Sequence, residues 1–366
     1  MASHSIFRLR CLLALAALAA SKADALTFNF STASFADSTT ANAYKAAAQQ
    51  AGAMWSSLFT DNITINVEIK YDTGTTGGSI ANTAASFLSP IASYATVRAA
   101  LVSDATTPDD LSATGHLQAG STMVFGINRG TSGGPGWRLD TGVNSPTANN
   151  QTVLVPRAEA KAIGLLAAND AAPDFSIKLN SSMVDTFKYD LDRSNGIGTT
   201  QYDLVGVIAH EMGHGMGMQS LAEILSVSGA FTSEANMVPY LADLFRFSNR
   251  SVTASAGAFD TAADTTAKYF SVDGGTTPLA NFALGGGTDP AFGNGQQANH
   301  WLDIALQPKI GIMDGIIGTG QLLEITPVDT RFFDVIGFDA VPETGTWAAG
   351  IALVAGALWS RRRSHR

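Results

Sequence analysis

Two histidines and a glutamate within one short segment are the residues of this chain that most directly indicate chemistry: His210, Glu211 and His214. Residues four apart lie on the same face of a helix, so both imidazoles can reach a single metal ion. Imidazole nitrogens bind Zn²⁺ at about 2.0–2.1 Å. Glu211 lies one position along, where its carboxylate can take a proton from a water molecule whose pKa the metal lowers. The pattern therefore predicts a zinc centre with a general base.

A catalytic zinc ion has three protein ligands and keeps a fourth position for water, so a third ligand must come from elsewhere in the chain. Of the six histidines, His4 and His365 lie in the end segments, which leaves His116 and His300 as imidazole candidates. Two carboxylates compete for the same role, those of Glu223 and Asp243. The spacing of these residues leaves the choice open.

The helix that carries the two histidines is predicted to begin near Thr200. Thr200 and Asp203 fit a capping box, in which two side chains accept hydrogen bonds from free backbone N–H groups of the first turn. The residues from Leu204 to Ile208 are almost all apolar, so we expect this helix to be buried.

Hydrophobic periodicity predicts a mixture of helices and strands around this helix, an α/β fold. The candidate helices span residues 41–59 and a segment beginning near Pro327, and the candidate strands span 63–71, 174–180, 244–248 and 269–272. Beyond Gly217 the chain is expected to be irregular, because Gly, Ser, Thr, Asn and Asp recur between short apolar runs.

The histidine segment resembles the metzincin metallopeptidases, whose motif HExxHxxGxxH extends beyond the second histidine. Gly217 matches the glycine of that motif, where a left-handed turn ends the helix. Ser220 stands where most metzincins have the third histidine, and a serine hydroxyl is not a credible replacement ligand.

The leishmanolysin-like branch of that family has a long insertion before its third histidine, which is followed by Trp. This sequence has His300-Trp301, then Met313 within a Gly-Ile-Met-Asp run, then an Asp-Val-Ile-Gly-Phe ending at residues 334–338. The resemblance implies that His300 is the third ligand and that Met313 forms a hydrophobic turn beneath the metal without binding it. It covers about residues 200–339, and Glu223 remains the rival to His300.

The same resemblance implies an α+β, metzincin-like architecture in two catalytic subdomains. Residues 26–217 would form a twisted sheet with the zinc helix, and residues 218–340 a loop-rich subdomain that returns His300 to the metal. The strand predicted at Asp174–Asn180 has the position of the family's edge strand, which binds an extended peptide as an added strand.

The first 25 residues predict a secretory signal peptide. Arg8 and Arg10 precede an apolar stretch from Leu12 to Ala20, and small residues follow at positions 23–25. Cys11, the single cysteine, lies in this segment, so the remaining chain has no disulfide, thiol nucleophile or thiolate ligand.

Residues 341–366 predict a bacterial C-terminal sorting signal, with an apolar stretch at 347–359 and a basic end. Val341-Pro342-Glu343-Thr344 resembles the PEP-CTERM signal, whose usual motif is Val-Pro-Glu-Pro. Residues 342–345 also fit the Pro-x-Thr-Gly of sortase substrates, so the identity of the processing enzyme stays open. We expect a sorting or transpeptidase enzyme as a partner, and a secreted, cell-surface or extracellular-matrix location.

The charge of the chain argues against nucleic acid as a partner. The formal net charge is −9, and the two end segments hold seven of the 22 Lys and Arg residues, so the remaining chain is more acidic still. The loop at Asp190–Gly196 resembles a calcium-binding loop in part, although it lacks the glycine at the sixth position and a well-placed closing Glu. Ca²⁺ is therefore a second, subordinate cofactor candidate.

Together these features predict a secreted zinc-dependent endopeptidase that holds one catalytic Zn²⁺ and hydrolyses protein or peptide substrates. Two alternatives differ in class: a non-catalytic surface or matrix protein with a structural zinc, and a zinc hydrolase acting on non-peptide bonds. An intact Glu211 argues against the first, because a structural site needs no general base.

Overall fold

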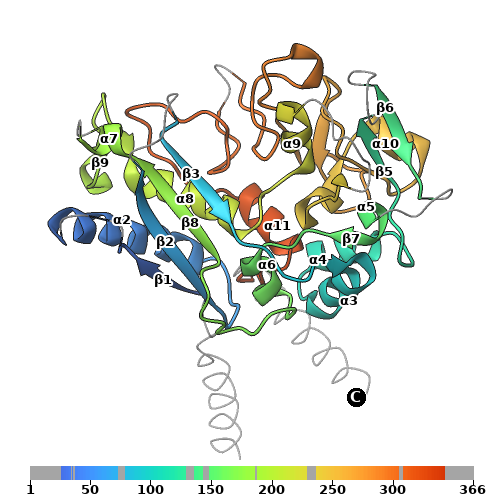
Figure 1. The fold of residues 1–366 in the computed structure, drawn as a ribbon, viewed down its shortest axis with the longest axis horizontal. Helices are drawn as coiled ribbons and strands as arrows, with labels where there is room; N and C mark the ends of the chain where they lie inside the picture. The colour runs from blue at the N-terminus through green and yellow to red at the C-terminus, as the bar shows by residue number, and fades with distance from the viewer. Residues whose placement is uncertain are drawn as a thin grey trace, which may run out of the picture.

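The computed structural model describes residues 26–342, apart from residues 34, 36–37, 73–78, 129–135, 143–147, 186–187, 229–235 and 305–307. The segment predicted as a signal peptide and almost all of the predicted sorting signal lie outside the described residues. The fold is mixed α/β, as predicted: a four-stranded mixed sheet packs against helices, and small sheets and loops complete the chain (Figure 1).

The main sheet has the strand order β1-β2-β8-β3. Strands β1 (Thr27–Ser31), β2 (Thr64–Asp72) and β8 (Phe175–Asn180) are parallel, and β3 (Ala81–Ala85) runs antiparallel to β8. The alternating Ile and Val residues of β2 are buried, so the strand predicted at residues 63–71 is confirmed within a residue.

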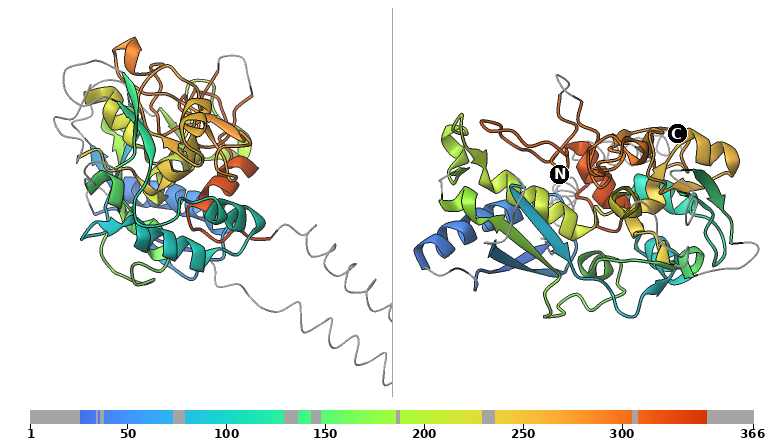
Figure 2. Two further views of the ribbon diagram at one scale, coloured as in Figure 1. Left: turned by 90° about the vertical axis from the view of Figure 1, so that its right-hand side faces the viewer. Right: turned by 45° about the horizontal axis from the view of Figure 1, so that its top comes forward.

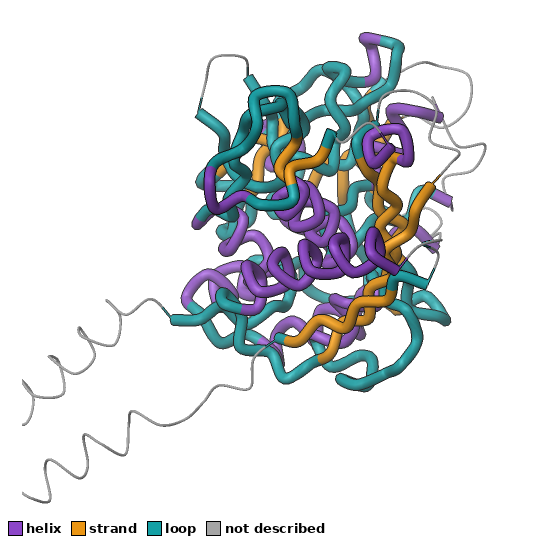
Figure 3. Tube along the Cα trace, turned by 90° about the vertical axis from the view of Figure 1, so that its left-hand side faces the viewer, coloured by secondary structure: helices purple, strands orange, loops and turns teal. Residues whose placement is uncertain are grey.

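Helices α2 (Ser38–Ser56) and α8 (Leu204–Met216) pack against each other, and each contacts strands of the main sheet. Figure 3 shows helices beside the twisted strands of the sheet. The indole N–H of Trp55 on α2 donates to the backbone carbonyl of Ala209 on α8 at 3.0 Å, which fixes one helix against the other. Every residue of α8 is buried, as its apolar sequence predicts.

Helix α8 begins at Leu204 rather than near Thr200, so the predicted capping box is wrong. Tyr202–Asp203 forms a short strand, β10, that pairs with β9 at Tyr189–Asp190, and this pairing keeps the chain extended up to the helix. Asp203 alone caps the helix, because its carboxylate accepts from the backbone N–H of Gly206 at 3.1 Å.

The strand predicted as the edge of the sheet is an interior strand. Strand β8 pairs with β2 on one side and β3 on the other, and five of its six residues are buried. The edge on this side of the sheet is β3, whose sequence Ala-Asn-Thr-Ala-Ala has too little apolar alternation to be recognised as a strand. The alternating pattern of β8 predicted a strand correctly. It could not predict that the strand has a partner on each side, because alternation does not depend on the number of neighbouring strands.

The C-terminal part of the described chain is rich in loops, as predicted, and lies beside the N-terminal sheet in Figure 1 and in the right-hand view of Figure 2. Its last helix, α11 (Pro327–Val335), begins at the predicted proline. Strand β12 (Phe259–Asp260) pairs with β5 (Phe125–Asn128), so hydrogen bonding joins distant parts of the chain. Among the described helices, none is long and apolar enough to cross a membrane.

The remaining elements are short and complete the layers around the sheet and α8. They are β4 (Ala92–Ser93), α3 (Tyr94–Asp104), α4 (Pro108–Gly115), β6 (Trp137–Asp140), α5 (Ala148–Gln151), β7 (Thr152–Val153), α6 (Arg157–Ala162), α7 (Ser181–Asp185), η1 (Arg193–Asn195), α9 (Leu221–Ser228), η3 (Leu241–Phe245), β11 (Arg246–Phe247), α10 (Asn249–Ala254), β13 (Lys268–Phe270), β14 (Ala280–Phe282) and η4 (Pro290–Phe292).

Candidate metal centre

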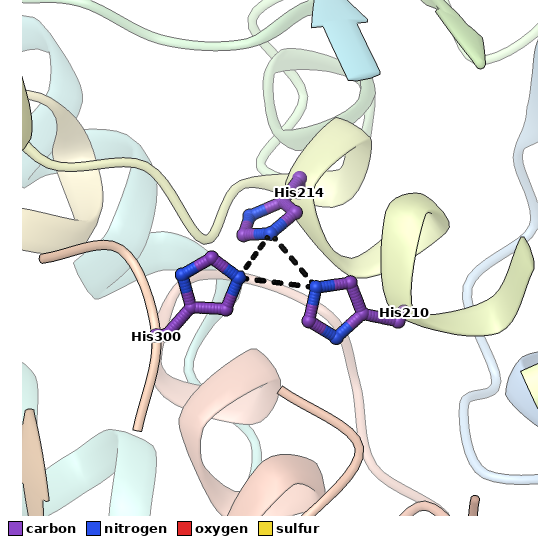
Figure 4. Close-up of side chains that lie close together, drawn as sticks. All are labelled: His210, His214 and His300. Carbon is purple, nitrogen blue, oxygen red and sulfur yellow. Dashed lines mark hydrogen bonds between the residues drawn. The ribbon is translucent and has the colours of Figure 1, made fainter. Parts of the chain in front are cut away.

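Three buried histidine side chains meet beside α8: His210, His214 and His300 (Figure 4). The first two stand one turn apart on the helix, and the third comes from the loop that follows η4. Their Nε2 atoms form a triangle with sides of 3.1, 3.1 and 3.2 Å. The structure thus brings together the two histidines of the helix and the third that the family resemblance implies.

The hydrogen bonds on the far side of each ring determine what the triangle can hold. The Nδ1 atoms of His210, His214 and His300 face the backbone carbonyls of Ile312, Met218 and Gln297 at 2.7, 2.9 and 3.2 Å. A carbonyl only accepts, so each neutral ring carries its single N–H on Nδ1 and leaves a lone pair on Nε2.

Three lone pairs at about 3.1 Å repel one another unless a cation lies between them. Tetrahedral zinc with bonds of about 2.0–2.1 Å places its nitrogen ligands about 3.3–3.4 Å apart, close to the separations in this triangle. The donor set and its spacing therefore fit a zinc ion.

Burial keeps all three rings neutral. It lowers the pKa of His210 to about 4, and burial together with the neighbouring His210 ring lowers that of His214 to about 3. The pKa of His300 is also far below its ordinary value, because the ring is buried next to the other two. Neutral imidazoles are the form in which histidine binds metals, so the site requires no deprotonation near neutral pH.

Glu211 opens into the same cleft as the three histidines. One of its carboxylate oxygens, Oε2, accepts a hydrogen bond from the Thr83 hydroxyl on β3 at 2.8 Å. Burial raises the pKa of Glu211 to about 7, and the Thr83 hydrogen bond opposes that shift. The carboxylate thus lies in a largely dry environment, where electrostatic interactions are strong.

Glu223, the rival for the third position, holds the histidine-bearing loop instead. Its Oε2 accepts from the backbone N–H groups of Gly286 and Ala298 at 3.1 and 2.7 Å. Arg246, fully buried, donates to the carbonyls of Ala283 and Ala298 at 2.8 and 2.9 Å. The metal-ligand group found among the described residues does not include Glu223.

The other candidates are also engaged elsewhere. Asp243 is buried and accepts from the Ser220 hydroxyl at 2.7 Å and from the Leu221 N–H at 2.9 Å. Ser220, at the usual position of the third histidine, is therefore part of a helix-capping contact. His116 is exposed at the end of α4, where its Nδ1 faces the Ser112 carbonyl.

Met313 packs directly against the helix between the two histidine turns. A Cβ atom added at Gly213 would lie 2.2 Å from the Met313 sulfur, so only glycine allows this approach. The Met313 carbonyl accepts from the backbone N–H of Trp301 at 2.9 Å, which ties this turn to the loop of His300. The indole of Trp301 donates in turn to Asp329 of α11 at 2.8 Å.

The cleft in front of the histidines has a volume of about 410 Å³. Strand β3 and the segment before it line one wall, and residues 315–317 line another. Apart from Glu211 and the three histidines, the lining side chains are uncharged. The cleft therefore has room for a substrate beside the three histidines, and its remaining walls are uncharged.

The loop at Asp190–Gly196, the candidate for Ca²⁺, does not belong to the group of three metal-ligand side chains found among the described residues. Its carboxylates bind the loop itself: Asp190 accepts from the N–H groups of Asp192 and Gly198, and Asp192 accepts from Ser194. The only group of metal-ligand side chains found in the described part of the chain is the histidine triad.

Sequence reasoning missed a buried acid behind the helix, Glu159 on α6. Its side chain is fully buried, and neither carboxyl oxygen has a hydrogen-bond partner among the described residues. It packs on Gly217, whose φ of 145° ends α8 and where a Cβ would lie 2.1 Å from Oε1. The sequence Arg-Ala-Glu-Ala-Lys-Ala of α6 looks like a solvated helix, so no pattern could have identified this residue.

We expect Glu159→Gln to remove a pH-dependent loss of stability. Burial raises the pKa of Glu159 well above 4.5, so the native state keeps a proton that the unfolded chain releases. The stability from this group is complete below pH 4.5 and is lost as the pH rises through the native pKa, at about 1.4 kcal/mol per pH unit. In urea unfolding between about pH 5 and pH 8, the free energy of unfolding of the variant should rise relative to that of the wild type by that slope. If the unfolding free energies of the variant and the wild type depend on pH in the same way, this prediction is wrong. Glu324→Gln, at an exposed carboxylate, is the matched control.

Comparisons with known proteins found no match: no family model matches the chain, and neither a curated protein nor a solved structure is significantly similar to it. The chemistry of the site must therefore be inferred from its own geometry.

Proposed function

We propose that this protein is a zinc-dependent endopeptidase of the metzincin type, most similar to the leishmanolysin-like branch. The observation that carries the proposal is the triangle of Nε2 atoms of His210, His214 and His300, with the Glu211 carboxylate in the same cleft. The Met313 turn against α8 and the sequence order His300-Trp301, Met313 and Asp334 to Phe338 support the family assignment.

In this proposal the three histidines hold one Zn²⁺, which polarises the substrate carbonyl and a water molecule when bound. Glu211 takes a proton from the attacking water and later transfers it to the leaving amine, so the carboxylate is regenerated in each cycle. Burial of the Glu211 side chain places these transfers in a low-dielectric environment, where electrostatic interactions are strong.

The edge strand supports peptide as the substrate. Strand β3 is paired on one side only, and residues 79–83 line the cleft with the histidines. An extended peptide can hydrogen-bond to such a free edge as an added strand, which places its backbone across the site. Uncharged walls favour neutral side chains near the bond to be cleaved.

A non-catalytic protein with a structural zinc is the second candidate. Structural zinc sites close all four positions with protein ligands. Here three ligands face a cleft of about 410 Å³ that also contains a carboxylate, which favours catalysis. A hydrolase of non-peptide bonds has no specific observation in its favour.

Export and surface processing remain part of the proposal, carried by residues 1–25 and 341–366 of the sequence. The partner would be a sorting or transpeptidase enzyme that recognises the Val-Pro-Glu-Thr-Gly region. Comparing the secreted protein's ends by mass spectrometry with the encoded ends tests both processing events.

Metal removal tests the proposed activity. We expect the purified protein to contain one zinc ion per chain and to digest casein, to lose both properties on treatment with 1,10-phenanthroline, and to recover both with added ZnCl₂. The melting temperature should fall on metal removal, because an ion that binds only the native state stabilises it. A metal-free protein that digests casein at the original rate, or a zinc-loaded protein that cleaves no peptide bond, would refute the peptidase proposal.

A further inference from the structure

Thr83, on the edge strand, contacts the general base at two points. Its hydroxyl oxygen lies 2.8 Å from Oε2 of Glu211 and 2.8 Å from the Glu211 backbone carbonyl oxygen. Thr83 itself belongs to β3, where its backbone pairs with Ile177 of β8. A single hydroxyl thus connects the proposed peptide-binding strand to the side chain that the proposed mechanism requires.

The two carboxylate oxygens of Glu211 differ in their surroundings. Oε2 is bound by Thr83, whereas Oε1 has no hydrogen-bond partner among the described residues and is not a fully buried atom. The cleft that contains the three histidines is lined by Glu211, so Oε1 is the oxygen left free to act there.

We propose that Thr83 is a positioning residue for Glu211: its hydroxyl holds Oε2 and so directs Oε1 toward the attacking water. This role rests on the proposed peptidase function. The proton of the water passes to Oε1 and from there to the leaving amine, while the single hydroxyl proton of Thr83 stays shared between Oε2 and the backbone carbonyl oxygen of Glu211. The hydroxyl therefore takes part in no proton transfer and acts only on the orientation of the base.

Orientation has a measurable effect because a general base must lie within hydrogen-bond reach of the proton that it takes. A free glutamate has several rotamers, and a misplacement of about 1 Å can reduce the rate by about 100-fold. Thr83 belongs to β3, the strand to which we propose that the peptide binds. Its hydroxyl therefore also fixes the Glu211 carboxylate relative to the substrate backbone.

The test uses the isosteric variant Thr83→Val, which removes the hydroxyl but keeps a β-branched side chain suited to a strand. We expect kcat for peptide hydrolysis to fall about 10- to 100-fold, with KM and zinc content close to those of the wild type. Thr83→Ser, which keeps a hydroxyl, should restore most of the rate. Thr253→Val, at an exposed hydroxyl of α10, is the matched control and should leave kcat unchanged.

A second measurement needs no activity. In the metal-free protein, the urea midpoints of Thr83→Val, Glu211→Ala and the double variant form a cycle, and we expect the two single shifts to be non-additive. Additive shifts, or an active Thr83→Val with wild-type kcat, would overturn the positioning role alone. A zinc-loaded wild type without hydrolytic activity would overturn the proposed function instead. The unfolding cycle separates the two failures, because it measures the contact between Thr83 and Glu211 without reference to activity.

Discussion

Glu211→Gln should retain zinc and lose about 10²- to 10⁴-fold in the rate of peptide hydrolysis. The substitution keeps the shape of the side chain, and the amide oxygen can still accept from the Thr83 hydroxyl at the position of Oε2. The three imidazoles are untouched, because each is held by a backbone carbonyl and none by Glu211. What the variant loses is a group that can take a proton from water.

The measurement is kcat/KM on a quenched fluorescent peptide, together with zinc content by atomic absorption. Glu324→Gln makes the same chemical change at an exposed residue outside the cleft and should leave both values unchanged. If Glu211→Gln cleaves the peptide as fast as the wild type, the proposed mechanism is wrong even if the protein binds zinc.

His300→Ala should weaken zinc binding by at least about 100-fold. Changes in residues that only orient a metal ligand already reduce affinity by about 10- to 100-fold, and removing one of three ligands should have a larger effect. The two remaining histidines lie on one helix, so the third corner of the triangle would have no imidazole ligand. Competition with a chromogenic chelator measures the affinity directly.

Two further variants make the assignment of the third ligand decisive. His116→Ala removes an exposed imidazole far from the triad in sequence and should retain full zinc. Glu223→Gln keeps an oxygen that can accept from the Ala298 N–H, so it too should retain the metal. Retention of full zinc by His300→Ala and its loss from Glu223→Gln would show that the carboxylate is the third ligand.

The helix and its two histidines could be predicted from sequence because their evidence is local. Four-residue spacing and a continuous apolar run specify a buried helix whatever surrounds it. His300 lies 86 residues beyond His214, so no periodicity connects them. Only the resemblance to a known order of motifs singled it out, and the structure brings it to within 3.1 Å of both other rings.

Properties that depend on tertiary neighbours could not be predicted in this way. The alternating pattern of β8 does not reveal whether the strand has one partner or two, and the small residues of β3 give almost no strand signal. Similarly, Glu159 and Glu223 are both glutamates in short helices. Glu159 has no hydrogen-bond partner in the described part of the chain, whereas Glu223 accepts from two backbone N–H groups. Their roles follow from which segments fold over them.

The separation of His300 from the helix gives the metal a second consequence, as a cross-link. Zinc bound by all three histidines would close a loop of 86 residues in a chain whose one cysteine lies in the predicted signal peptide. In the chain-entropy model a covalent cross-link around a loop of that size stabilises the native state by about 4.5 kcal/mol. An ion held by this triad would thus act as a reversible substitute for a disulfide, and its removal should loosen the loop-rich part of the chain that carries His300.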